Sequence, residues 1–163
     1  MRNLIYLSFS FILVSAILFS CSKDKGIDPN QAFSDKGLLD SCKNTLAFSY
    51  YYNKPDSVYT GAHGPHGSFK LKFNKIAYAA LTASGKLPIG SKFPNGSMIV
   101  KEVVSGNGIS LYALMYKRNN SWLWAEIEPG GKVLFSVNKE SSTCTSCHSQ
   151  AGNRDLVDSF NFY

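Results

Sequence analysis

Residues Ser97–Glu128 read SMIVKEVVSGNGISLYALMYKRNNSWLWAEIE, and this stretch decides the fold. It consists of runs rich in β-branched and aromatic residues, separated by the turn sequences Gly106–Asn107–Gly108 and Asn119–Asn120. Short strands that follow one another through turns, with no helix between them, predict an antiparallel sheet. The expected strands cover residues 97–105, 108–117 and 121–128.

Residue periodicity predicts further elements on both sides of this stretch. Strict alternation predicts one half-buried strand, and the residues after Pro129–Gly130–Gly131 predict another. Apolar residues three or four positions apart predict a long amphipathic N-terminal helix with Ser34 as its N-cap. Asn74 is placed to cap a short second helix. The two strands are expected over residues 68–73 and 132–137, the long N-terminal helix over 33–52 and the short second helix over 74–81. The expected fold class is α+β, a single domain rich in antiparallel β-sheet.

The N-terminus has the pattern of an export signal. A positively charged start, Met1–Asn3, precedes the apolar run Leu4–Ser20, and no stop-transfer pattern follows. The run ends in Leu18–Phe19–Ser20–Cys21, which resembles a bacterial lipobox, in which the cysteine is acylated. The alternative is an ordinary signal peptide, or one retained as an anchor, with a chance cysteine. We expect a signal peptide over 1–20, lipidated Cys21 with a tether over 21–32, and a folded domain over 33–163. Such a protein is exported and anchored to a bacterial membrane, facing the periplasm or the cell exterior.

The charge of the chain excludes one class of partner. The formal net charge is +6 at pH 7 over 163 residues. Lysine and arginine are spread along the sequence instead of clustering, so the pattern does not indicate a nucleic-acid-binding surface.

The clearest chemical signal is Cys144–Thr145–Ser146–Cys147–His148. This C-x-x-C-H spacing is that of covalent c-type haem attachment: the two thiols bind the porphyrin vinyl groups, and the adjacent imidazole ligates the iron. The alternatives are a redox dithiol, half of a zinc site or a structural disulfide, but no second cysteine pair completes a zinc site. We expect haem c on Cys144 and Cys147, with His148 as axial ligand, in a C-terminal haem-attachment loop or one helical turn beyond the sheet. The remaining thiol, Cys42, is expected to be buried and free, with intermolecular pairing as the alternative.

One strand residue does not fit its predicted position. Alternation puts Lys101 on the same face as Ile99 and Val103, which is expected to be apolar. A lysine there either extends its charged end to solvent from a strand edge or has a function.

Three features, in order along the chain, resemble the cytochrome P-460 family. They are Phe93–Glu102 (FPNGSMIVKE), Trp122–Leu123–Trp124, and the Cys144–His148 motif followed by Asp155. The resemblance covers about residues 63–162. It implies a small β-rich haem protein, usually a homodimer, with five-coordinate iron and an open distal side. The lysine that matches Lys101 is bonded to a porphyrin meso carbon in the founding members, so the resemblance implies a Lys101–haem crosslink. The related cytochromes c-prime-beta share the fold, lack the crosslink and bind small gases.

The sequence departs from the family at the distal site. The founding members oxidise hydroxylamine with a distal carboxylate as proton acceptor, about one strand beyond the lysine. The corresponding residues Leu111–Leu114 contain no acid, and a general base must lie within hydrogen-bond reach of the substrate. His66, and less strongly His63, are candidate substitutes, although both lie in a glycine- and proline-rich turn where solvated histidines are common.

Three functions remain open from the sequence. The first is oxidation of hydroxylamine or a related nitrogen species, which requires a redox partner protein. The second is binding of nitric oxide or carbon monoxide by open-sided iron, which the missing carboxylate favours. The third is simple electron transfer with a sixth ligand such as Met98 or Met115. Both methionines lie in predicted strands and are expected in the core, so electron transfer ranks last.

Overall fold

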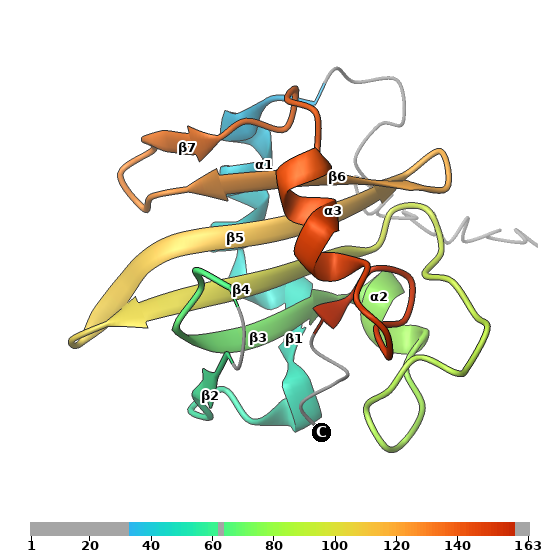
Figure 1. Cartoon of the computed structure of the whole chain (residues 1–163). Helices are drawn as coiled ribbons and strands as arrows, with labels where there is room; N and C mark the ends of the chain where they lie inside the picture. Colours follow the sequence, from blue (N-terminus) through green and yellow to red (C-terminus); the bar gives the residue numbers. More distant parts are fainter. Residues whose placement is uncertain (1–32, 62–63, 159–163) are drawn as a thin grey trace, which may run out of the picture.

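The structure is a computed structural model that describes residues 33–61 and 64–158 (Figure 1). The predicted signal peptide, Cys21, the tether and His63 lie outside the described residues. Within those residues, no helix has the length and apolar character needed to cross a membrane.

Antiparallel strands form one sheet, as the sequence predicts. Seven strands are present among the described residues, in the order β1-β3-β4-β5-β6-β7, with β2 also paired to β3 (Figure 1). They are β1 (Phe48–Tyr50), β2 (Tyr59–Thr60), β3 (Ser68–Asn74), β4 (Met98–Ser105), β5 (Gly108–Arg118), β6 (Ser121–Ile127) and β7 (Val133–Phe135). The five strands expected from alternation and turn sequences are therefore confirmed, with ends that differ by a few residues.

Three α-helices complete the described fold: α1 (Asp35–Lys43), α2 (Lys75–Ala79) and α3 (Ser142–His148). Both predicted N-caps are confirmed. Ser34 Oγ accepts a hydrogen bond from the Gly37 amide at 3.1 Å, and Asn74 Oδ1 accepts one from the Ala77 amide at 3.0 Å. Each cap satisfies an amide that has no partner in the first helical turn.

The prediction of a long N-terminal helix over 33–52 is wrong. Helix α1 ends at Lys43, and the chain continues through a 3₁₀ turn (Thr45–Ala47) into β1. The side chain of Leu46, which the helical pattern would have buried, is 97% exposed. Aromatic residues follow, and they favour a strand that pairs with β3 (Phe48 opposite Asn74). Tertiary pairing has therefore overridden a weak helical period.

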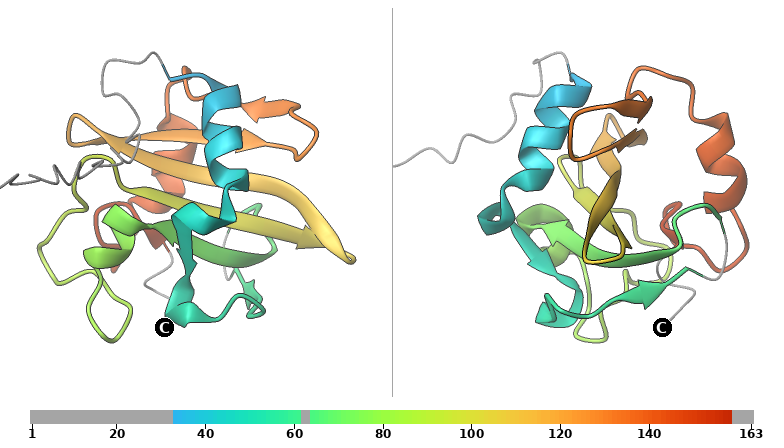
Figure 2. Two further views of the ribbon diagram at one scale, coloured as in Figure 1. Left: turned by 180° about the vertical axis from the view of Figure 1, so that it is seen from behind. Right: turned by 90° about the vertical axis from the view of Figure 1, so that its left-hand side faces the viewer.

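The sheet is covered on both faces. One core cluster contains Phe69, Phe73, Ile99, Trp122 and Trp124, and it lies on the face that α3 covers. The other lies beneath α1 and contains, among others, Leu38, Leu39, Cys42, Val100 and Leu114. Figure 2 shows α1 and α3 on opposite sides of the sheet. Successive side chains along each strand therefore point to opposite faces of the sheet, and only one of these faces is covered by α3.

Turn geometry and one bulge set which side chains lie side by side. Asn119 and Asn120 have φ of 49° and 60°, the left-handed values of a tight two-residue hairpin, so β5 and β6 pair from Arg118 opposite Ser121 onward. Between β4 and β5 the register shifts by one residue at Val103/Val104. Such a bulge reverses which strand residues share a face on its two sides.

Candidate functional site

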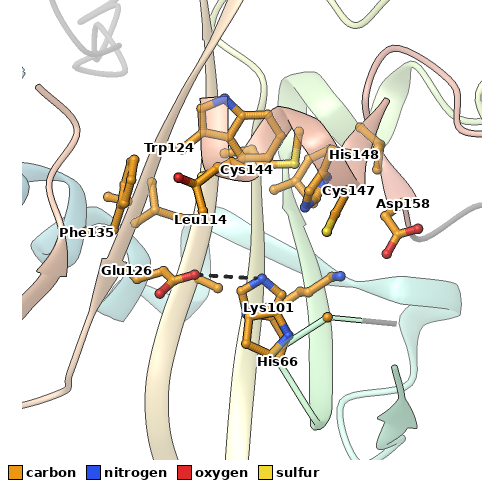
Figure 3. Close-up of a pocket in the computed structure, with 18 of the residues that line it drawn as sticks. His66, Lys101, Leu114, Trp124, Glu126, Phe135, Cys144, Cys147, His148 and Asp158 are labelled. Carbon is orange, nitrogen blue, oxygen red and sulfur yellow. Dashed lines mark ion pairs between the residues drawn. The ribbon is translucent and has the colours of Figure 1, made fainter. Parts of the chain in front are cut away.

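A pocket lies between α3 and the sheet face that α3 covers. Its volume is about 350 Å³, within the roughly 300–1,000 Å³ of small-molecule and cofactor sites. Its walls come from β4, β5, β6, β7, α3, the loop at Gly64–His66 and the C-terminal segment at Val157–Asp158. Figure 3 shows Cys144, Cys147 and His148 on one side of the pocket and Lys101, Glu126 and His66 on the other.

The C-x-x-C-H motif lies on helix α3, which agrees with the helical alternative, and the expectation of a C-terminal loop is wrong. Its five residues occupy the last turns of α3, and Cys144, Cys147 and His148 all line the pocket. Positions three and four apart share one face of a helix, which explains how both thiols and the imidazole reach one cavity. None of the three described cysteines, Cys42 included, is in a disulfide, and Cys42 is buried as expected.

His148 is held in one orientation. Its Nδ1 lies 2.8 Å from the carbonyl oxygen of Leu156. Because a carbonyl only accepts, Nδ1 carries the hydrogen and Nε2 keeps a free lone pair. The ring also stands edge-on to Trp124, with centroids 4.5 Å apart. Burial lowers the pKa of His148, which favours the neutral imidazole. A neutral imidazole with Nδ1–H hydrogen-bonded is the form that binds a metal through Nε2.

Lys101 lies on the predicted face and is buried, with 8% of its surface exposed. Its Nζ stands 4.6 Å from the centroid of the Phe69 ring. Burial lowers the pKa of the ammonium group, although the nearby charge of Asp158 acts in the opposite direction. Strand β4 is paired with β3 on one side and β5 on the other, so the strand-edge explanation for Lys101 is wrong.

Glu126 is a pocket residue that sequence reasoning missed. It lies directly opposite Ala113, which in turn lies opposite Lys101, so the three side chains form one row across β4, β5 and β6. Its carboxylate lines the pocket, whereas Leu111–Leu114 contain no acid, and burial raises the pKa of Glu126. Alternation in β6 could have revealed this position, because it places Glu126 on the same face of the strand as Trp122 and Trp124.

His66 lies in the pocket next to this carboxylate. Its Nε2 is 3.8 Å from Glu126 Oε1, the contact drawn as a dashed line in Figure 3. Burial, assisted by the nearby Lys101 and His148, lowers the pKa of His66 to about 4. The imidazole is therefore neutral at pH 7, and the contact is polar but not an ion pair at that pH.

Several buried polar atoms around the pocket lack partners. Among the described residues, His66 Nδ1, Trp124 Nε1 and Asp158 Oδ1 are buried without a hydrogen bond, and all three residues line this cavity. Buried polar atoms without partners are rare in folded proteins and call for an explanation such as a bound group. The donor set fits a c-type haem: two thiols, one neutral imidazole and an otherwise mainly apolar cavity. Within residues 33–61 and 64–158, no three or more His, Cys, Asp or Glu side chains are grouped so that they could hold a bare metal ion.

Comparison of the chain with protein-family models, curated proteins and solved structures found no match.

Proposed function

We propose that this chain is a c-type haem protein that acts on small nitrogen species at an open distal site, with hydroxylamine as its type of substrate. One observation carries the proposal. Cys144, Cys147 and His148 open onto the same pocket as Lys101, Glu126 and His66. A haem-attachment motif thus faces a set of groups that can bind and move protons.

Cys144 and Cys147 would hold the porphyrin through thioether bonds, and His148 would ligate the iron through Nε2. The bound haem would supply an iron centre that coordinates a small ligand and accepts electrons from it. The apolar residues Ile99, Phe135 and Val157 would limit water around that ligand.

On the opposite wall, Glu126 would accept protons. Oxidation of hydroxylamine by two electrons releases two protons, so a base within reach of the substrate accelerates the reaction. The carboxylate of Glu126 is only half-buried, and His66 beside it is neutral at pH 7, so protons can leave through either group. The electrons would pass to a redox partner protein.

Lys101 is the candidate for a covalent bond to the porphyrin. Burial favours its neutral amine, which is the nucleophilic form. Lys101 would form a C–N bond in place of one N–H and one C–H bond. Two protons and two electrons leave in this step, and a peroxide oxidant would take up the electrons.

Binding of nitric oxide or carbon monoxide without turnover is the second candidate. It is favoured by the apolar part of the lining, which suits an uncharged diatomic ligand. Electron transfer ranks lower because Met98 lies in the core cluster beneath α1, away from the pocket. Met115 is a buried core residue that also lines the pocket, so it is the methionine that electron transfer would require as sixth ligand.

The proposal also covers the location and the oligomeric state of the protein. Acylated Cys21 would anchor the protein to a bacterial membrane after export, and the domain would pair as a homodimer.

Optical spectra and a turnover assay of the purified full chain test the proposal. A strongly red-shifted Soret band would indicate the Lys101 crosslink, and an ordinary five-coordinate ferrous spectrum would indicate haem without it. Reduction of an artificial electron acceptor by hydroxylamine would support the oxidase, whereas binding of nitric oxide without turnover would support the second candidate. A six-coordinate spectrum without ligand binding would contradict both and favour electron transfer.

A further inference from the structure

We propose that Asp155, held by Lys117, is a positioning residue for the axial histidine. It fixes the backbone so that the Leu156 carbonyl accepts the hydrogen bond of His148 Nδ1. This inference rests on the proposed function only for the role of His148 as iron ligand, because every contact in it belongs to the chain itself.

The first step is a buried ion pair outside the pocket. Lys117 Nζ lies 2.7 Å from Asp155 Oδ1 and 2.9 Å from Oδ2, so both oxygens are engaged. The Lys117 side chain is 2% exposed and that of Asp155 is 6% exposed. Lys117 also lies 4.8 Å from the centroid of the Trp122 ring. The pair therefore joins β5 to the segment that follows α3.

The second step is that Asp155 has more partners than an ion pair needs. Its Oδ2 also accepts a hydrogen bond from the Phe93 amide at 2.9 Å, and its backbone carbonyl accepts one from Trp122 Nε1 at 2.7 Å. Side chain and backbone of one residue are thus held by three separate parts of the chain.

The third step is the backbone that these contacts hold. Asp155 and Leu156 have φ of 49° and 63°, left-handed values that are uncommon outside glycine and unfavourable for leucine. Consecutive residues keep such a conformation only where surrounding contacts impose it. At the second of them, the carbonyl oxygen of Leu156 lies 2.8 Å from His148 Nδ1. The ion pair therefore stabilises the unusual turn that presents this acceptor.

The consequence concerns the electronic properties of the ligand. A hydrogen bond from the second ring nitrogen fixes the tautomer and makes the metal-bound nitrogen more basic. Loss of the Leu156 acceptor would leave His148 free to adopt the other tautomer and to rotate. A second contact, from Asn153 Nδ2 to the His148 carbonyl at 3.0 Å, would still hold the backbone of α3. Ring orientation and helix position are therefore separable.

The test compares three variants of the full chain. Asp155→Asn and Lys117→Met remove the ion pair with little change in volume. Lys72→Met is the matched control, because it removes a lysine that is equally buried and paired, with Glu102, on the opposite face of the sheet. Two readouts are measured: the iron–histidine stretching frequency of the ferrous haem protein, and the tautomer of His148 by ¹⁵N NMR before haem attachment.

We expect the Nδ1–H tautomer in the wild type. In Asp155→Asn and Lys117→Met the tautomer ratio should shift roughly two- to tenfold toward Nε2–H, as expected for the loss of one hydrogen bond. The iron–histidine frequency should fall in the same two variants, and Lys72→Met should change neither readout. The proposal is overturned if both readouts stay at their wild-type values, or if Lys72→Met moves them as far. Absence of haem from the wild type would refute the proposed function, while the tautomer would still decide the positioning role.

Discussion

Replacement of Glu126 by glutamine removes a base from the pocket with almost no change in side-chain volume. The carboxylate lies in the row Lys101–Ala113–Glu126 and faces the cavity, so its loss should affect the chemical step more than folding. General-base catalysis typically contributes about 10²- to 10⁴-fold to a rate. We expect the lower end, about 10²-fold in kcat for hydroxylamine, because neutral His66 lies 3.8 Å away and can accept protons in its place.

The pH dependence gives an independent check on the same residue. Burial raises the pKa of Glu126, so its carboxylate is protonated at a higher pH than that of an exposed glutamate. Because only the ionised form accepts a proton, the rate of the wild type should fall on acidification through this raised pKa. In Glu126→Gln the acidic limb should move down to about pH 4, because the substitute base His66 has its pKa lowered to about 4 by burial.

The assay is steady-state reduction of an artificial electron acceptor by hydroxylamine, measured across pH with the haem-loaded protein. His66→Gln is the matched control and should cost less than Glu126→Gln, whereas the double variant should lose more than either. A Glu126→Gln protein that retains kcat within about twofold, far less than a general base contributes, would refute the role of this carboxylate.

Three further predictions concern other parts of the chain. Lys101→Leu should abolish any red shift of the Soret band, and an unchanged band would remove Lys101 from the account. Lys72→Met should lower the free energy of unfolding by about 3–5 kcal/mol in urea denaturation, because it leaves the buried carboxylate of Glu102 unpaired; a loss below about 1 kcal/mol, the value of an exposed pair, would contradict this. Burial raises the pKa of the Cys42 thiol to about 12, so a thiol reagent should label it only after unfolding, and fast labelling of the native protein would show that the site is open.

Much of the sheet was predictable because its signals are local. Alternation located β3, and Gly106–Asn107–Gly108 and Asn119–Asn120 located two hairpins, since these turns need only a few residues. The end of α1 was not predictable in the same way. Phe48–Tyr50 has apolar spacing that suits either a helix or a strand, and only pairing with β3 decides between them.

The residues on the two sides of the pocket were not equally predictable from the sequence. Cys144–His148 is a contiguous motif, so its residues could be identified without knowing the fold. Glu126 becomes a neighbour of Lys101 only through the register of two strand pairs. The tight turn fixes Glu126 opposite Ala113, but the bulge at Val103/Val104 decides that Lys101 lies opposite Ala113 as well. Without that bulge Lys101 would lie opposite Tyr112. No local sequence pattern predicts the extra residue of the bulge.

Mass spectrometry of the peptide that contains Cys144 and Cys147 tests the central claim most directly. The mature full chain would be produced in a host that attaches haem c, and Cys144→Ala/Cys147→Ala would serve as the control. We predict one haem bound to the wild-type peptide through two thioether bonds and none on the control. Two free thiols with no added porphyrin mass, under conditions that load another c-type cytochrome, would contradict the account.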